Sequence, residues 1–409
     1  MLEALPLVFV LIGLVLYTVL GGADFGAGFW QLFAGRGPHA ERIREGAHES
    51  MGPVWEANHV WLIFVLTVFW TAYPSAFGSI ASTLAVPLFI AAIGIVFRGA
   101  AYGLRAGAAN ARESARIDTV FALSSILTPF ALGAAVGGIA TNRVPVGNAA
   151  GDMWSSWLNP TSIFIGLLAV ATSAYLAAVY LAADFARDGR RELERDFRVR
   201  ALGAGIVAGA AAVGGIFVVE SDSHELFHSL LHGRALPAVI VSALAGLATL
   251  ALVYRRRYEP ARYTAALAVA AVVAGWALAR WPTILPGLTV DQAAAGHDTL
   301  VAVVVAVLAG GAIVFPALAF LFRLALTGRF AAQDSTSTTA PGGRARRRLA
   351  PRLLVRAAAA CLIAGFGLLN VADAAWAHAI GLVCLFAFVL IAFRAIVSLA
   401  LGEETAQPL

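Results

Sequence analysis

The feature that most constrains this chain is a succession of apolar segments, each about 20 residues long, separated by short polar loops. That length is what a helix needs to cross the hydrocarbon core of a bilayer, and a backbone surrounded by lipid must satisfy its own hydrogen bonds, as a helix does. We therefore expect an all-α fold, a polytopic bundle of transmembrane helices. The nine expected spans of the first 326 residues are 5–30, 54–73, 77–97, 118–139, 160–183, 201–219, 235–254, 262–281 and 299–326.

The composition agrees with a membrane environment. Of 409 residues, 60% are apolar and 13% are charged, whereas soluble domains are roughly 45–50% apolar and about 25% charged. Forty glycines fit the same interpretation, because small residues let helices approach closely in lipid. The first apolar segment has neither a basic region before it nor a cleavage site, so we expect it to remain as the first spanning helix.

The apolar pattern resumes after a polar interruption. A low-complexity run at 333–343 and an arginine cluster precede two further apolar segments at 353–369 and 375–399. We therefore expect three parts: a nine-helix core over residues 1–326, a cytoplasmic, polar and arginine-rich linker over 327–352, and a two-helix extension over 353–409.

A short repeat divides the core. The tripeptide Ala-Asp-Phe occurs at residues 23–25, near the end of the first span, and again at residues 183–185, at the end of the fifth. This spacing suggests that the core consists of two related four-helix units plus one further helix.

The arginines indicate the orientation of the spans. All 29 basic residues are arginine. The loops after the first, third, fifth and seventh spans carry 3, 4, 6 and 4 arginines, and the segments after the ninth and eleventh carry 8 and 1. Because arginine gathers in cytoplasmic loops, we expect a multi-pass protein of a bacterial cell membrane with its N-terminus outside and its C-terminus in the cytoplasm. This distribution also argues against a nucleic-acid partner.

Ionisable residues inside a membrane are costly, so each is a candidate for function. Asp24 lies near the end of the first span, where Gly22 and Gly26 form a seam that lets another helix approach the carboxylate. The alternative is an acid at the membrane interface that the cytoplasm hydrates.

The second span begins with a dense polar cluster. Glu56, Asn58 and His59 lie between Trp55 and Trp61. Tryptophan anchors helices at membrane interfaces, but a carboxylate shielded from water acquires a raised pKa suited to proton relay. We interpret Glu56 as a proton carrier, whereas His59 is either a second relay or a hydrogen-bonded interfacial residue.

Arg98 ends the third span. The expected topology places Asp24, Glu56 and Arg98 toward the cytoplasmic ends of their helices, where they can share one pocket. Arg98 either holds a carboxylate in its ionised form or anchors its helix at the positive side of the membrane.

The sequence offers few residues that could bind a metal ion or haem iron. His224, His228 and His232 recur every four residues in an outer loop, but successive steps of four drift about 40° around a helix. We favour an amphipathic interfacial helix there and keep zinc as the weaker alternative.

Haem iron needs His, Met or Cys ligands, and the spans hold few of them, so we expect no cofactor bound by this chain. The cysteines, Cys361 and Cys384, lie in separate apolar runs and suit packing.

Two motifs together resemble a known family. The run GGADFGAG at 21–28, followed by GPVWEANHVWLI at 52–63, resembles subunit II of cytochrome bd-type quinol oxidases. The similarity extends over roughly residues 1–326, through Phe97-Arg98, Thr128-Pro129-Phe130, Leu158-Asn159-Pro160, Arg200-Ala201-Leu202-Gly203, Trp281-Pro282, Leu285-Pro286 and Phe315-Pro316.

The resemblance implies a membrane heterodimer in which a homologous subunit I carries b- and d-type haems, oxidises quinol and reduces oxygen to water. This chain would then stabilise its partner and supply a cytoplasmic proton path through Glu56, in contact with membrane lipids and quinone. Some relatives carry another acid after the arginine that ends the third span, and this chain has none in 99–105. Residues 327–409 lie outside the family pattern and suit the place of a small accessory single-helix subunit.

Two other classes compete with this interpretation. A proton- or ion-coupled transporter also has buried acids, glycine-rich helices and internal repeats, but it predicts substrate-binding broken helices near the membrane midplane. A purely structural membrane scaffold predicts that the acids play no part in turnover.

The expected topology places loop 141–158 outside the membrane. A single cysteine introduced into this loop, with Cys361 and Cys384 replaced, should react with a membrane-impermeant maleimide added to intact cells. Labelling only after the membrane is opened would invert this part of the topology.

Overall fold

The computed structural model describes residues 1–35, 37–51, 55–105, 107, 110–326, 351–371, 376, 377, 379–388, 390 and 391. The side chains of Trp55 and Glu56 lie outside the described part, as does most of the expected linker.

The first half of the chain is helical between short turns. It comprises α1 (Leu5–Leu16), a π-helical turn η1 (Tyr17–Gly21), α2 (Gly22–Leu32), α3 (Pro38–Met51), α4 (Trp55–Ala72), α5 (Pro74–Thr83), α6 (Ala85–Arg105) and α7 (Ala111–Ala140). Asn110 caps α7 by accepting a hydrogen bond from the Glu113 N–H.

The second half continues with long helices and one small hairpin. Its elements are α8 (Pro160–Arg187), α9 (Arg191–Asp222), α10 (His224–Leu231), α11 (Leu236–Tyr254), α12 (Tyr258–Arg280), β1 (Thr283–Leu285), β2 (Leu288–Thr289), α13 (Val290–Ala293), α14 (His297–Leu326) and α15 (Pro351–Val371). The two strands pair antiparallel.

The expected transmembrane helical bundle is confirmed, although the number of nine core spans is not. Within the described residues, eight helices are long and apolar enough to cross a membrane. They are Leu5–Leu32, Ala85–Arg105, Arg112–Ala140, Pro160–Arg187, Arg191–Asp222, Leu236–Tyr254, Tyr258–Arg280 and His297–Val314. The segment expected at 54–73 is helix α4, whose described apolar run, Asn58–Ala72, is shorter than these eight.

The span expected at 77–97 differs from the structure. The chain breaks at Leu84 between α5 and α6, so the long helix starts at Ala85 and continues to Arg105. Pro87 explains the break, because a proline has no N–H to donate to the carbonyl of Thr83, four residues earlier. The short helix α5 therefore ends where the spanning helix begins.

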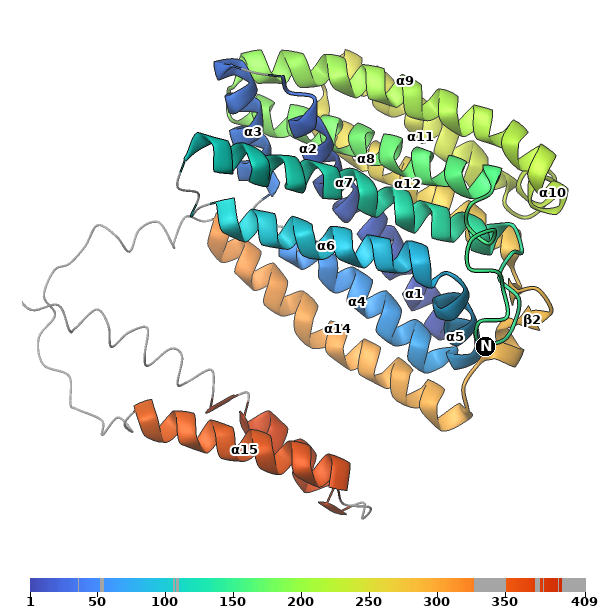
Figure 1. Cartoon of the computed structure of the whole chain (residues 1–409), viewed down its shortest axis with the longest axis vertical. Helices are drawn as coiled ribbons and strands as arrows, with labels where there is room; N and C mark the ends of the chain where they lie inside the picture. The colour runs from blue at the N-terminus through green and yellow to red at the C-terminus, as the bar shows by residue number, and fades with distance from the viewer. Residues whose placement is uncertain are drawn as a thin grey trace, which may run out of the picture. The chain divides into compact units, whose positions relative to one another are not determined.

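Helix α8 is the centre of the first of two compact units, Met1–Ala319. It packs against α2 and α7 on one side and against α9 and α12 on the other. In sequence order, α1 to α7 and α8 to α12 thus form two neighbouring groups of helices that meet along α8 (Figure 1). The second unit, Phe320–Leu409, includes α15, where Gly365 lies against Leu385 of the short helix Ala379–Phe388.

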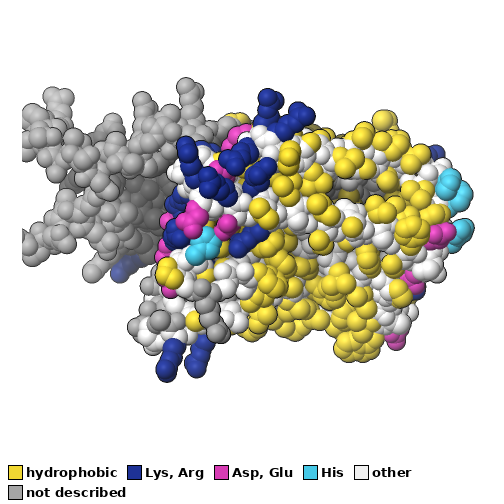
Figure 2. Space-filling model, turned by 90° about the horizontal axis from the view of Figure 1, so that it is seen from above, with side chains coloured by type: hydrophobic (Ala, Val, Ile, Leu, Met, Phe, Trp, Pro, Cys, Tyr) yellow, Lys and Arg dark blue, Asp and Glu magenta, His cyan; other side chains and the backbone are white. Residues whose placement is uncertain are grey.

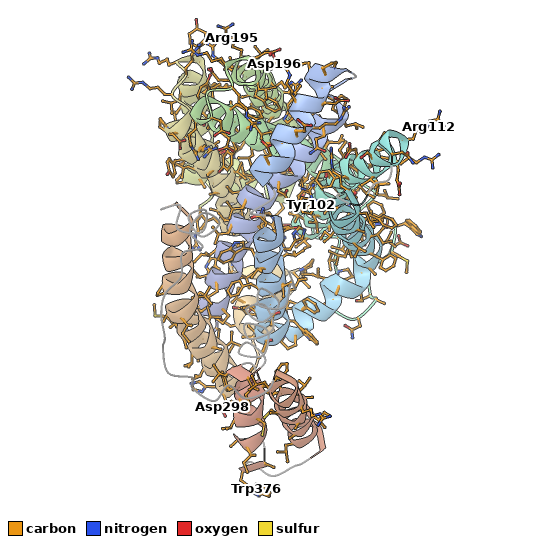
Figure 3. The ribbon with its side chains drawn as sticks, turned by 90° about the vertical axis from the view of Figure 1, so that its left-hand side faces the viewer. Tyr102, Arg112, Arg195, Asp196, Asp298 and Trp376 are labelled. Carbon is orange, nitrogen blue, oxygen red and sulfur yellow. The ribbon has the colours of Figure 1, made fainter. Side chains whose placement is uncertain are left out.

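The two ends of the first unit differ in charge. Figure 2 shows arginine and acidic side chains gathered at one end, a broad apolar surface beside them, and histidine with acidic side chains at the opposite end. The first of these, called here the arginine-rich end, contains α3, the start of α7 and the turns joining α8 to α9 and α11 to α12. Arg112 and Arg195 point outward there (Figure 3). This division matches the alternation of arginines between loops.

Glycines permit the closest helix contacts. A Cβ atom added at Gly26 of α2 would overlap the backbone carbonyl of Ser173 in α8, and one at Gly22 would lie 3.2 Å from Leu176. Gly133 of α7 similarly faces the backbone of α8 at Gly166. In lipid, such backbone contacts contribute dispersion energy that larger side chains would prevent.

Gly26→Ala should therefore destabilise the bundle by about 1–3 kcal/mol, the usual effect of overpacking, because the obstructing group is backbone. The measurement is the thermal unfolding midpoint of the purified protein in detergent. Gly203→Ala is the matched control, since Gly203 is an exposed helical glycine with no atom within 4 Å of an added Cβ. Equal midpoints for the two variants would contradict this account of the contact between α2 and α8.

Candidate functional site

The candidate site is built around an arginine and an aspartate buried within the bundle. Arg98 of α6 is 1% exposed and Asp24 of α2 is 0% exposed. Nη2 of Arg98 donates to Oδ1 of Asp24 as an ion pair and also to the Asp24 carbonyl oxygen at 3.0 Å. Either charge alone would be costly at this depth, so the pairing explains how both are tolerated.

A third helix completes the arginine's surroundings. Nη1 of Arg98 donates to Oγ of Ser125 in α7, and that hydroxyl donates in turn to the Phe121 carbonyl at 2.6 Å. The guanidinium carbon lies 4.3 Å from the Phe121 ring centroid and 5.0 Å from that of Phe25. Rings on both helices therefore contribute cation–π attraction to a charge with little access to water.

Gly28 makes the space for this arrangement. A Cβ atom at position 28 would overlap Oγ of Ser125 and lie 3.3 Å from Nη1 of Arg98. The glycine run of the first span thus has two separate uses, since Gly26 faces α8 whereas Gly28 faces the arginine and its serine partner.

Helix α4 joins the site through Asn58. Tyr17–Gly21 forms a π-helical turn between α1 and α2, and such a turn displaces the regular pattern of backbone hydrogen bonds, often at functional sites. Asn58 is 3% exposed and donates from Nδ2 to the Leu20 carbonyl at 3.2 Å. The asparagine therefore fixes α4 to the irregular turn that precedes Asp24.

Three rings from the site, those of Tyr17, Phe25 and His59, pack together. The His59 ring centroid lies 6.2 Å from that of Tyr17 and 6.1 Å from that of Phe25, with interplanar angles of 71° and 79°. Tyr17 and Phe25 are likewise edge to face at 6.3 Å. His59 is therefore part of the same cluster as Asp24 and Arg98, although it comes from a different helix.

The cluster retains unused hydrogen-bonding capacity. Among the described residues, the Tyr17 hydroxyl, Oδ2 of Asp24 and Nε of Arg98 are buried without a hydrogen-bond partner. Buried polar atoms of this kind are ordinarily satisfied, and ordered water is the usual partner in polar sites. The second carboxylate oxygen of Asp24 and the Tyr17 hydroxyl are therefore free to take part in further hydrogen bonds inside the bundle.

Four of the five polar candidates from the sequence meet here: Asp24, Asn58, His59 and Arg98. The side chains of Glu56 and Trp55 lie outside the described residues, and Trp61 packs against Phe64 of its own helix at 6.3 Å. The sequence did not single out Tyr17, Phe121 or Ser125. The pair Ser124 and Ser125 within the apolar run of α7 was a signal that could have been used.

The second copy of the Ala-Asp-Phe tripeptide, at residues 183–185, also contributes its aspartate to an ion pair. Asp184 of α8 pairs with Arg262 of α12, and Nη2 of Arg262 also donates to the Tyr180 carbonyl at 2.9 Å. The Asp184 side chain is 21% exposed and that of Arg262 is 20% exposed. The repeated acid therefore makes a similar contact in a wetter place, with an arginine at the start of its helix instead of near the end.

Two of the three histidines spaced by four, His224 and His228, belong to α10, and His232 follows that helix as its C-cap residue. The rings of His228 and His232 stack with centroids 4.8 Å apart, and His224 stacks on Phe227 at 6.0 Å. No group of three or more histidine, cysteine, aspartate or glutamate side chains suited to a metal ion occurs in the part of the chain that the structure describes.

The fold and the buried pair together define a class, that of polytopic helical membrane proteins with an ionisable cluster inside the bundle. Residues 2–325 match the family model of the cytochrome bd terminal oxidase subunit II. Because the match covers most of the chain, the protein belongs to this family, which confirms the resemblance seen in the two sequence motifs.

Individual relatives agree with the family. The chain is 30% identical over 117 residues to the cytochrome bd ubiquinol oxidase subunit 2 of Bacillus subtilis, covering 29% of this chain and 34% of the relative. It is 26% identical over 180 residues to the cytochrome bd-I ubiquinol oxidase subunit 2 of Escherichia coli, covering 42% and 46% respectively. These aligned stretches thus span about a third and just under half of the two relatives.

A solved structure shows the same fold over a longer stretch. A chain of the bd oxidase from Geobacillus thermodenitrificans superposes with a TM-score of 0.64 at 24% identity, covering 80% of this chain and 99% of that chain. The helical arrangement is therefore that of an oxidase chain, even where the sequences have diverged.

Asp24→Asn should lower stability by about 3–5 kcal/mol, because it leaves the Arg98 charge buried without a counter-charge. The double variant Asp24→Asn with Arg98→Gln should recover more than half of that loss, since neither charge remains. Thermal unfolding in detergent measures both.

Glu192→Gln is the control for this experiment. Glu192 pairs with Arg42 at the exposed arginine-rich end, where loss of an ion pair changes stability by less than about 1 kcal/mol. A double variant no more stable than Asp24→Asn alone would contradict the coupling of the two charges.

Proposed function

We propose that this chain is the haem-free second subunit of a membrane terminal oxidase that oxidises quinol and reduces oxygen to water. The observation that carries the proposal is the family match over residues 2–325. The Bacillus subtilis and Escherichia coli relatives are both named as subunits of ubiquinol oxidases.

The haems of such an oxidase are assigned in this proposal to a homologous subunit I, where they would carry electrons from quinol to oxygen. The donor set of this chain supports that assignment. Haem iron takes His, Met or Cys ligands. His59 is packed edge-on against two rings at one end of a helix, and the two cysteines belong to the second compact unit. This chain's part is then to stabilise subunit I and to conduct protons.

The proton path is proposed to begin at the arginine-rich end and to pass Glu56 and the buried cluster. Glu56 precedes His59 by three residues in α4, which is less than one turn of the helix. Ionised Asp24 and Arg98 form a neutral pair, so a proton that passes along the cluster does not approach an unbalanced positive charge. The hydroxyl of Tyr17 and the free oxygen of Asp24 supply further acceptors.

The orientation in the membrane is part of the same proposal. The gathering of arginines at one end favours that end as the cytoplasmic side. The N-terminus is then outside, the C-terminus is in the cytoplasm, and the proton path opens toward the cytoplasm.

The test is purification of the chain from its native membrane, followed by a reduced-minus-oxidised haem spectrum and an assay of quinol-driven oxygen consumption. The expected result is a co-purifying partner with b- and d-type haems and quinol oxidation. A solitary protein without haem would contradict the oxidase assignment and favour a transporter.

Glu56→Gln should reduce quinol-driven oxygen consumption by tenfold or more, because general acid–base groups contribute about 10²–10⁴ to rates where proton transfer limits turnover. Haem content should remain unchanged, since the substitution keeps the shape of the side chain. Oxygen electrode rates normalised to the haem spectrum measure both.

Glu49→Gln is the matched control, because Glu49 forms an exposed ion pair with Arg190 at the same end of the molecule. If Glu56→Gln retained full turnover, the chain would act as a scaffold without a role in proton transfer through this residue.

A further inference from the structure

A cavity lies at the arginine-rich end, away from the buried pair. Its volume is ≈ 410 Å³, and it opens between the last turns of α8 and the turn that joins α11 to α12. Ala183, Ala186 and Pro260 form apolar walls, whereas Arg187, Arg256 and Arg257 supply cations. Pockets for small molecules typically measure about 300–1,000 Å³, so this one is large enough for a polar headgroup.

The lining of the cavity has three arginines and one carboxylate, so it carries an excess of positive charge. Glu259 is the carboxylate of its lining, and it is already bound by Arg187 at 2.9 Å. Arg256 is 53% exposed and is 3.9 Å from Glu194. Among the described residues, no ion pair or hydrogen bond is made by the Arg257 side chain. Arg257 is thus available to an anion, and Arg256 is held by the protein only through its long ion pair with Glu194.

The backbone at Arg256 has a conformation that side chains disfavour. Arg256 has φ +57°, a left-handed conformation that glycine adopts most easily. It follows the end of α11 in a turn where Arg257 N–H bonds the Leu252 carbonyl at 2.8 Å and Arg256 N–H bonds that of Val253 at 3.0 Å. At the end of α8 the comparable position is Gly189, with φ +71°. A strained residue of this kind is a reason to look for a function.

The position of the cavity relative to lipid indicates the kind of ligand. Tyr254 and Tyr263, on either side of the turn, are 69% and 76% exposed, and exposed tyrosines mark the membrane interface. A ligand with an anionic head and an apolar remainder would match both the arginines and the alanine and proline walls. Anionic phospholipids of the cytoplasmic leaflet have this chemistry and attract arginines near the surface.

We propose that this cavity binds the phosphate headgroup of an anionic phospholipid, with Arg256 and Arg257 as its contacts. This site is separate from the proton path, and it rests on the proposed orientation, with the arginine-rich end in the cytoplasm, but not on the oxidase assignment. Bound lipid would tie the turn between α11 and α12 to the end of α8, where the second ion pair is also located.

The test uses the full chain, purified from native membranes with any accompanying subunits and exchanged into phosphatidylcholine and detergent. Native mass spectrometry during titration with phosphatidylglycerol should show one tightly held phosphatidylglycerol per chain. Arg256→Gln with Arg257→Gln should weaken binding about 25-fold, or roughly fivefold for each arginine near a membrane surface. Arg191→Gln with Arg195→Gln, which removes two exposed arginines outside the cavity, should leave it unchanged.

Arg256→Gly separates loss of the site from loss of the fold. Glycine suits the left-handed backbone, so this variant should bind phosphatidylglycerol about fivefold more weakly while its melting temperature is no lower than that of the unaltered protein. Equal binding by the Arg256/Arg257 double variant, or equal retention of phosphatidylcholine by the unaltered protein, would overturn the proposal. Displacement of phosphatidylglycerol by equimolar inorganic phosphate would also overturn it, because the site would then take free anions.

Discussion

The burial of an arginine together with a carboxylate inside an apolar bundle is the constraint on which the first group of helices depends. A single charge at such a depth costs several kcal/mol, so Asp24 and Arg98 must meet, and their helices must lie within contact of each other. Ser125 brings in α7 and Asn58 brings in α4. One charged pair therefore sets the mutual positions of helices that are far apart in sequence.

The same constraint explains the glycine-rich motif that carries the family resemblance. Gly28 leaves room for the guanidinium and its serine partner, and Gly26 lets α2 meet the backbone of α8. Both faces of this part of α2 are therefore covered by other helices, and Gly26, Ala27 and Gly28 are all buried. The motif is thus a packing solution for a charged site as well as a recognition signal for the family.

Much of this could be predicted from the sequence, for a physical reason. The membrane determines how long the apolar segments are and where the arginines gather. The helical membrane fold and the difference in charge between its two ends could therefore be predicted. The break at Leu84 was missed, because hydropathy continues across it and only the absent N–H of Pro87 marks it. The π-helical turn at Tyr17–Gly21 and its bond to Asn58 were missed because they depend on contacts between distant segments. Ser125 was missed for the same reason.

The repeated aspartate differs in solvent exposure between the two groups of helices. The Asp24 side chain is fully buried, whereas that of Asp184 is partly exposed. The central claim is that the sealed pair serves proton transfer as well as structure. Its most direct test is the rate of quinol-driven oxygen consumption, per haem, of the complex carrying both Asp24→Asn and Arg98→Gln. The account predicts a folded, haem-loaded complex whose turnover is reduced at least tenfold, within the range of acid–base contributions. Full turnover in that complex would show that the pair is structural alone.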